Sequence, residues 1–244
     1  MRIGEGYGNK LRLVDLSPAE IDVVKQALAR LTRQPKALPC ALLYDESGSA
    51  LFEQITQVPE CYPTRTEVAF LRANLADIQA AIAPCTRLVE LGSGSATKTR
   101  ILVSGLAVRE YVPIEIARAQ LIESAAAIAQ DFPDLDRSAI RADYTQPLDL
   151  PERAEAATRT VVFFPGSTIG NFEPVEALSF LPRWRRLAGE SIVTEHSYKY
   201  SVESFCALAR GAGWSPRALW IDAEGLFSLH WLTTHAGSPT RTQR

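Results

Sequence analysis

Hydrophobic residues in the first part of the chain recur at the spacing of α-helices. A helix is predicted to begin just after Ser17, where serine, proline and glutamate occupy the positions that helix starts prefer. This helix is expected to bury one apolar stripe, formed by Ile21, Val24, Leu28 and Leu31. Further helices are predicted over 48–58 and from 66 to 78, with a constrained turn over 59–67 between them.

From Arg87 onward, short apolar runs alternate with amphipathic helical patterns. Helices are predicted over 97–106 and 117–130. The predicted strands are Leu88–Gly92, Glu110–Ile116, Ala139–Tyr144 and Val161–Gly166. Strands that are apolar throughout and separated by helices are typical of a parallel sheet covered on both faces. The pattern therefore predicts an α/β fold with a mostly parallel sheet.

The C-terminal part predicts one helix over 202–212 and two strands over 217–222 and 226–233. Because only a short loop separates these strands, we expect them to pair antiparallel, with one at the edge of the sheet. The polar tail over 237–244 is predicted to be disordered. No repeat or linker divides the chain, so a second domain would be interwoven with the first.

Composition and charge are those of an ordinary globular protein. The 244 residues are 46% hydrophobic and 22% charged with a formal net charge of −2, which predicts a normal core and no basic face for nucleic acid. No apolar run approaches a membrane span, and the first 20 residues lack the core of a signal peptide. The 4 cysteines form no Cys-x-x-Cys pair, which argues against a metal site and for a cytoplasmic location.

A glycine turn follows the first strand predicted for the sheet. Gly92 and Gly94 allow positive φ and close approach to a ligand, although such turns also end strands for structural reasons alone. Glu115 ends the next strand, where a carboxylate can bind both hydroxyls of a ribose. Asp143 and Tyr144 end the third strand, where an acid can accept from an adenine amino group and an aromatic ring can pack on the purine. Together these residues indicate a cofactor that contains a nucleoside.

Two features favour S-adenosylmethionine over a nicotinamide dinucleotide. A dinucleotide-binding turn ordinarily has a third glycine, but Thr97 and then Lys98 stand in that region. Glu90, two residues before the first glycine, suits a ligand that carries positive charge and an ammonium group. A nicotinamide-dependent dehydrogenase remains the alternative at this point.

Longer motifs along the chain carry a resemblance to a known family. In chain order they are Tyr44–Glu53, Pro63–Glu67, Glu90–Gly94 with Lys98–Arg100, Phe164–Phe172 and Thr194–Tyr200. These motifs resemble those of the histidine-specific S-adenosylmethionine-dependent methyltransferases, whose best-known members make trimethylhistidine for ergothioneine biosynthesis. The resemblance runs from about residue 38 to residue 232. It implies a Rossmann-like methyltransferase sheet and S-adenosyl-L-methionine as cofactor.

The resemblance also implies roles for individual residues. The implied donor-binding residues are Gly92, Lys98, Glu115, Asp143 and Tyr144, to which the interpretation of the glycine turn adds Glu90 and Gly94. The implied substrate-binding residues are Cys61, Tyr62, Gly166, Asn171, Glu195 and Ser197. We further expect Asn171 to be the catalytic residue, because its amide would orient the lone pair of the substrate amine. Glu195 and Ser197 share one side of an extended segment, where they would hold the imidazole of a histidine substrate.

The chain departs from the family pattern at two places. Cys61 stands where family members have the first of two adjacent tyrosines. The stretch between Asn171 and Glu195 is also much shorter than in the family, where a long insert completes a core strand and builds much of the substrate domain. We expect residues 191–194 to take the place of that strand. An exposed edge strand over 194–200 is the structural alternative.

We therefore expect three parts in the chain. These are a helical substrate-side region over 1–72, a donor-binding domain over 73–236 with a reduced substrate insert near 172–200, and the tail over 237–244. The expected function is methylation of the α-amine of histidine or a related amino acid by a monomeric enzyme without nucleic-acid or membrane partners. The alternative is a non-catalytic binding or regulatory protein derived from a methyltransferase.

Overall fold

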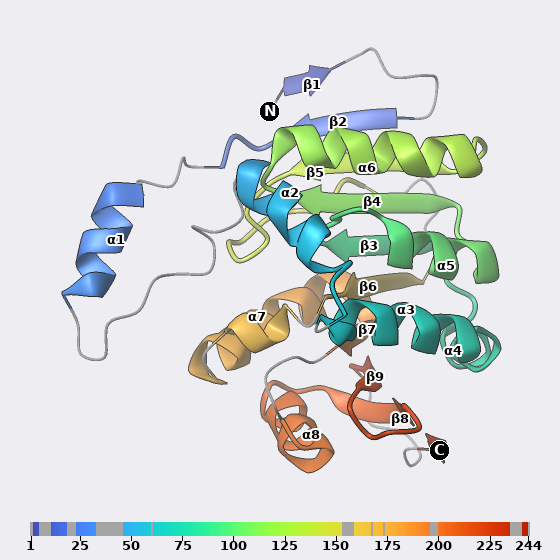
Figure 1. Cartoon of the computed structure of the whole chain (residues 1–244). Helices are drawn as coiled ribbons and strands as arrows, with labels where there is room; N and C mark the ends of the chain where they lie inside the picture. The colour runs from blue at the N-terminus through green and yellow to red at the C-terminus, as the bar shows by residue number, and fades with distance from the viewer. Residues whose placement is uncertain are drawn as a thin grey trace.

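A central mixed sheet with helices on both faces forms the body of the protein (Figure 1). The computed structural model describes residues 2–4, 11–18, 23–32, 46–59, 61–152, 159–166, 168–172, 174–195, 200–234 and 241–243. Among these, no helix is long and apolar enough to cross a membrane.

The strands follow the order β1-β2-β5-β4-β3-β6-β7-β9-β8-β10 across the sheet. Their bounds are β1 Arg2–Gly4, β2 Leu11–Asp15, β3 Arg87–Leu91, β4 Glu110–Glu115, β5 Asp136–Arg141, β6 Thr160–Phe164, β7 Gly189–Glu195, β8 Ser215–Ile221, β9 Ser228–Thr233 and β10 Arg241–Gln243. Neighbours from β2 to β7 in this order are all parallel, whereas β9 runs antiparallel to both β7 and β8. The predicted mostly parallel sheet with an antiparallel C-terminal strand is confirmed.

The helices cover the sheet from both sides because alternate residues of its buried strands point to opposite faces. Their bounds are α1 Val23–Leu31, α2 Glu46–Ile55, α3 Tyr62–Ala73, α4 Leu75–Ile82, α5 Thr97–Gly105, α6 Arg118–Asp131, the 3₁₀ turn η2 Ile169–Asn171, α7 Pro174–Ala188 and α8 Val202–Gly211. On one face, Leu88 and Phe163 pack with residues of α3, α4 and α5. On the other face, Val89 and Phe164 pack with residues of α7 and α8.

Strand β7 includes residues 191–194, which the sequence predicts to form a core strand of the sheet. It pairs in parallel with β6 and antiparallel with β9, so that Val193 lies between Phe163 and Trp231. Helix α7 leads directly into this strand. A core strand that includes residues 191–194 is therefore confirmed, and its replacement of a strand of the family stays a prediction. The alternative of an exposed edge strand is wrong for residues 194–195, because β9 pairs along the outer side of β7.

Strand β2 is absent from the sequence-based prediction. It extends the parallel sheet beyond β5, with Leu11 beside Arg137 and Asp15 beside Arg141. The region over 1–72 is therefore not purely helical. A 5-residue strand in which polar and apolar residues mix is too short to give a clear periodic signal.

The expected burial of one apolar stripe on the first helix is wrong. Helix α1 exists, but Val24 is 68% exposed, Leu28 60% and Leu31 41%. Ile21 lies outside the described residues. Figure 1 shows α1 standing away from the sheet, which accounts for the exposure of these three side chains.

Two smaller predictions also need correction. The predicted turn over 59–67 ends early, because α3 already begins at Tyr62 with a proline in its first turn. The predicted single helix from 66 to 78 is broken at Asn74 into α3 and α4.

The tail that the sequence predicts to be disordered contains β10, which pairs in parallel with β8. The expectation that one strand of the C-terminal pair lies at the edge of the sheet is therefore wrong, because β9 lies between β7 and β8, and β10 pairs along the outer side of β8.

Candidate functional site

Three strands that are neighbours in the sheet end together at its carboxyl edge. The order β5-β4-β3 brings the glycine turn after β3, Glu115 at the end of β4 and Asp143 after β5 to one side. Strand β6 lies next to β3, so the loop after β6, which contains Gly166, starts from the same edge. Ligands of open α/β sheets bind outside the carboxyl ends of the strands, so this edge is the candidate site.

The glycine turn has the backbone geometry that its sequence predicts. Gly92 has φ +76° and Gly94 has φ +42°, conformations that side chains disfavour. The Gly92 amide donates to the carbonyl of Ile114 at 2.9 Å, which ties the turn to β4. A Cβ on Gly92 would lie 3.7 Å from Cε1 of Tyr144. Two predicted donor-binding residues are therefore adjacent in space.

Glu115 and Asp143 each use one carboxylate oxygen to order the local backbone. Oε1 of Glu115 accepts from the amides of Ile116 at 2.8 Å and Ala117 at 3.1 Å. Oδ1 of Asp143 accepts from the amide of Thr145 at 2.9 Å and from its hydroxyl at 2.6 Å. Burial raises the pKa of Glu115, while the two backbone hydrogen bonds oppose this rise. Within the described part of the chain, the second oxygen of each carboxylate has no hydrogen-bond partner.

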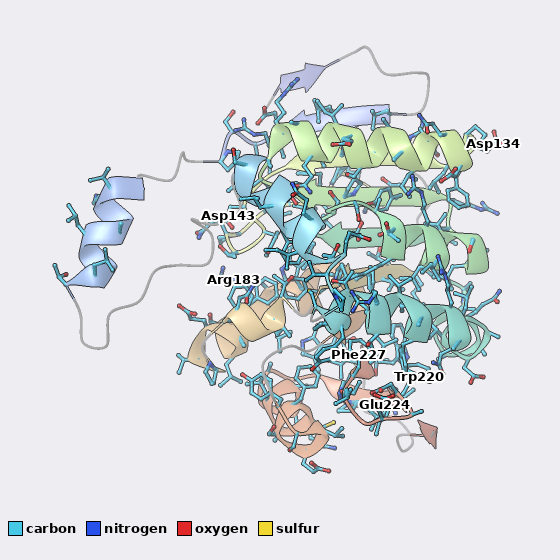
Figure 2. All side chains as sticks on the ribbon, in the orientation of Figure 1. Asp134, Asp143, Arg183, Trp220, Glu224 and Phe227 are labelled. Carbon is cyan, nitrogen blue, oxygen red and sulfur yellow. The ribbon has the colours of Figure 1, made fainter. Side chains whose placement is uncertain are left out.

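The loop that carries Asp143 is held against α7. The ring of Tyr144 packs edge-on against Phe164 and Phe180, with ring centroids 5.7 and 6.3 Å away. Arg183 of α7 donates to the carbonyl of Thr145. In Figure 2, Asp143 and Arg183 lie near each other on the side to which β4 points, whereas Asp134 lies on the opposite side.

Glu90 lies beneath the turn, with 2% of its surface exposed. Its carboxylate accepts a hydrogen bond from the hydroxyl of Tyr111 on β4 and lies beside Thr99 of α5. Burial raises the pKa of Glu90 to about 8, while the two hydroxyls oppose this rise. The carboxyl group of Glu90 already has buried protein partners. A direct contact between Glu90 and the cofactor therefore stays a prediction.

Lys98 and Gly166, one predicted for the donor and one for the substrate, meet at a third residue. Lys98 lies in the first turn of α5 and forms an ion pair with Glu67 of α3. The Gly166 amide donates to Oε1 of the same glutamate at 3.4 Å. Gly166 has φ +80°, and a Cβ there would lie 3.7 Å from Nζ of Lys98.

Of the other predicted substrate residues, the structure describes some in full and some only in part. Asn171 ends the 3₁₀ turn η2 and is exposed. Cys61 and Tyr62 lie at the start of α3, where Tyr62 is 48% exposed and the Cys61 amide donates to the carbonyl of Val58 at 3.1 Å. Glu195 ends β7, opposite Leu229 of β9, but its side chain lies outside the described residues. Ser197 also lies outside them.

Glu67 is a site residue for which the sequence predicts no role. It belongs to the motif Pro63–Glu67, which is the available sequence signal for it. In the same motif, Arg65 donates to the carbonyls of Val58 and Pro59, both at 2.6 Å, and so fixes the start of α3. In this motif, Arg65 therefore orders the backbone before α3, and the carboxylate of Glu67 lies at the sheet edge.

A family model for histidine-specific, SAM-dependent methyltransferases matches residues 23–189 and 186–234. Histidine N-alpha-methyltransferase from Mycolicibacterium smegmatis is 41% identical over 157 residues, which are 63% of this chain and 48% of that protein. A 4-dimethylallyltryptophan N-methyltransferase from Epichloe festucae var. lolii is 31% identical over 176 residues, 69% of this chain and 51% of that protein.

Solved structures show the same fold at low identity. Magnesium protoporphyrin IX methyltransferase from Synechocystis, with bound SAM, superposes with a TM-score of 0.61 and 11% identity, covering 90% of this chain and 100% of that one. The chain spans about half the length of the curated relatives that it matches. Because the family model matches in two segments that together include most of the residues, the chain belongs to the family of histidine-specific, SAM-dependent methyltransferases.

Proposed function

We propose that the protein transfers a methyl group from S-adenosylmethionine to the α-amine of histidine or a related amino acid. The observation that carries the proposal is the meeting of donor and substrate segments at one carboxylate, where Glu67 contacts both Lys98 and the amide of Gly166. An enzyme with two reactants must hold both in a fixed relative position, because alignment of the reacting atoms accounts for a large part of the rate enhancement.

The residues at the sheet edge fit the proposed donor. Gly92 leaves room next to Tyr144 that a larger side chain would fill. Glu115 and Asp143 each present an oxygen for which the described residues supply no hydrogen-bond donor. These oxygens suit the ribose hydroxyls and the adenine amino group, and Lys98 suits the donor's carboxylate. When bound, the donor supplies a methyl group on a sulfonium, which is already activated for transfer.

The chain's own residues would bind and orient the two reactants. Gly166 and Asn171 would hold the amine and carboxylate of the amino acid beside the donor. Glu195, at the end of β7, and Ser197 would hold its side chain. The amine must lose its proton before it attacks, and water can accept that proton. Alignment of nitrogen, methyl and sulfur supplies up to about 7 to 11 kcal/mol in well-oriented model reactions.

We propose that the stretch between Asn171 and Glu195, which is shorter than in the family pattern, leaves an open substrate pocket. Helix α7 ends at Ala188 and β7 begins at Gly189, so no additional element lies between them. This geometry supports a broader set of amino-acid acceptors, including tryptophan derivatives. We further propose that the enzyme works in the cytoplasm as a monomer.

Two measurements test this function. Calorimetry with S-adenosylhomocysteine should show binding, and Asp143→Ala should weaken it about tenfold through loss of a ligand hydrogen bond. Asp134→Ala, an exposed aspartate on the opposite side of the sheet, is the matched control (Figure 2). Mass spectrometry should then detect methylated product with histidine, tryptophan or their derivatives. If the protein binds the donor but methylates none of these acceptors, the proposed enzymatic function is contradicted and a non-catalytic binding protein is favoured.

A further inference from the structure

The ion pair between Glu67 and Lys98 connects two parts of the molecule that the proposed reaction needs together. Glu67 lies on α3, in the N-terminal region, whereas Lys98 lies on α5, directly after the glycine turn. The Glu67 side chain is 2% exposed and that of Lys98 15% exposed. The pair is therefore largely shielded from water, where removal of one charge would leave the other buried without this partner.

The same carboxylate also reaches the loop after β6. One oxygen contacts the Lys98 ammonium, while the other accepts from the Gly166 amide at 3.4 Å. Gly166 approaches so closely that a Cβ there would lie 3.3 Å from the Thr168 hydroxyl and 3.7 Å from Nζ of Lys98. Three segments that are distant in sequence thus meet at one side chain.

The next cation on α5 has a different partner. Nε of Arg100 lies 2.6 Å from Oδ2 of Asp131 on α6, and both side chains are substantially exposed. Lys98 is therefore the α5 cation that faces the site, and Glu67 is the anion that faces it from α3.

We propose that Glu67 is a positioning residue, which holds the Lys98 ammonium in the orientation that binds the donor's carboxylate and fixes the Gly166 loop relative to it. This inference rests on the proposed function, because it assigns Lys98 to the donor. Glu67 touches neither reactant in this role, so its replacement acts through Lys98 and Gly166.

The first test compares two ligands that differ in the group Lys98 would bind. S-adenosylhomocysteine carries an amino-acid portion whose carboxylate Lys98 would bind, and 5′-methylthioadenosine has only a methyl group in place of that whole portion. Glu67→Gln keeps an oxygen for the Gly166 amide but removes the charge that orients Lys98. In calorimetry, we expect this substitution to lower the affinity for S-adenosylhomocysteine about tenfold and the affinity for methylthioadenosine less than about twofold. Glu123→Gln, the same change on an exposed part of α6, should alter neither affinity.

The second test uses Lys98→Met, which removes the group through which Glu67 acts. In that background, Glu67→Gln should no longer change the affinity for S-adenosylhomocysteine. The double variant should also melt at a higher temperature than Lys98→Met alone, because it no longer buries an unpaired carboxylate.

The positioning role would be overturned if Glu67→Gln lowered the affinity for both ligands equally. It would also be overturned if the losses of affinity for S-adenosylhomocysteine were additive in the double variant. If the unaltered protein binds neither ligand, the proposed function fails first. The two failures are therefore distinguishable.

Discussion

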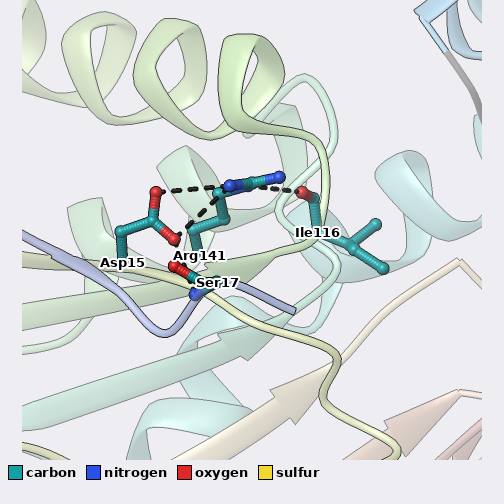
Figure 3. A network of polar contacts seen from close by, with 4 residues as sticks. All are labelled: Asp15, Ser17, Ile116 and Arg141. Atoms are coloured by element: carbon teal, nitrogen blue, oxygen red, sulfur yellow. Dashed lines mark hydrogen bonds and ion pairs between the residues drawn. The ribbon is translucent and has the colours of Figure 1, made fainter. Parts of the chain in front are cut away.

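The carboxylate of Asp15, at the end of β2, forms an ion pair with Arg141 at the end of β5, with Nη1 and Oδ2 3.3 Å apart (Figure 3). Nε of Arg141 also donates to the carbonyl of Ile116 at 3.3 Å. Ile116 directly follows Glu115, whose carboxylate accepts from the Ile116 amide. Strand β2 is thus connected, through two side chains, to the turn that we propose for the donor's ribose.

Asp15→Asn should lower stability at neutral pH by up to about 1 kcal/mol, the range of partly exposed ion pairs. The pKa of Asp15 is lowered from 3.8, because the Ser17 amide and Arg141 together outweigh the opposing effect of burial. A carboxyl with a lowered folded-state pKa stabilises the fold above its unfolded pKa, and this stability is lost as the pH falls through the folded value. Urea unfolding should therefore show the difference at neutral pH and its disappearance well below pH 3.8. A difference that is constant with pH would contradict this account.

Glu90→Gln should show the opposite pH dependence. Burial raises the pKa of Glu90 from 4.5 to about 8, so between these values the folded protein retains a proton that the unfolded chain releases. Its stabilising contribution is present below pH 4.5 and is lost as the pH rises towards 8. The stability of Glu90→Gln relative to the unaltered protein should thus rise by up to about 1 kcal/mol per pH unit across this window. Parallel stability profiles for the two proteins would rule this out, and Glu123→Gln serves as the control.

The central sheet could be predicted from sequence because its strands are buried on both faces. All residues of β3 and β6 are buried, and such apolar runs give a strong signal. Strand β2 gives a weak one, because polar residues mix with Leu13 and Val14. The exposure of α1 could not be predicted at all. Helical periodicity identifies an apolar stripe, but the stripe on α1 is covered only if another part of the protein lies beside it.

The donor side of the site could be predicted better than the substrate side. Gly92, Glu115 and Asp143 follow consecutive strands of the parallel pattern, so the fold itself brings them to one edge. Glu67 reaches that edge from α3, and no local pattern shows where a helix before the sheet will dock. The role of Arg141 likewise depends on β2, which the sequence did not reveal.

Leu28→Gln on α1 should change the free energy of unfolding by less than about 0.5 kcal/mol, because surface substitutions remove little packing. Leu28 is 60% exposed, although the sequence predicts that it is buried. Ile78→Ala on α4 is the contrasting variant, since Ile78 is 0% exposed and its truncation should cost about 2 to 5 kcal/mol. Urea unfolding of both variants measures the difference. A large loss in Leu28→Gln would show that α1 packs against an apolar surface after all.

Gly105→Ala should destabilise the protein even though alanine favours helices. Gly105 is the last residue of α5, where helix propensity alone would favour alanine by about 1 kcal/mol. A Cβ at this position would lie 2.6 Å from Cδ1 and 2.7 Å from Cγ of Leu75 on α4, too close for the leucine to avoid by moving only its tip. Overpacking of this kind costs about 1 to 3 kcal/mol, which exceeds the gain in propensity.

The matched variant Leu75→Ala removes the clashing side chain. In that background Gly105→Ala should cost nothing or stabilise, so the two substitutions should be strongly non-additive in urea unfolding. Stabilisation by Gly105→Ala in the otherwise unaltered protein would show that α4 and α5 are farther apart than their packing indicates.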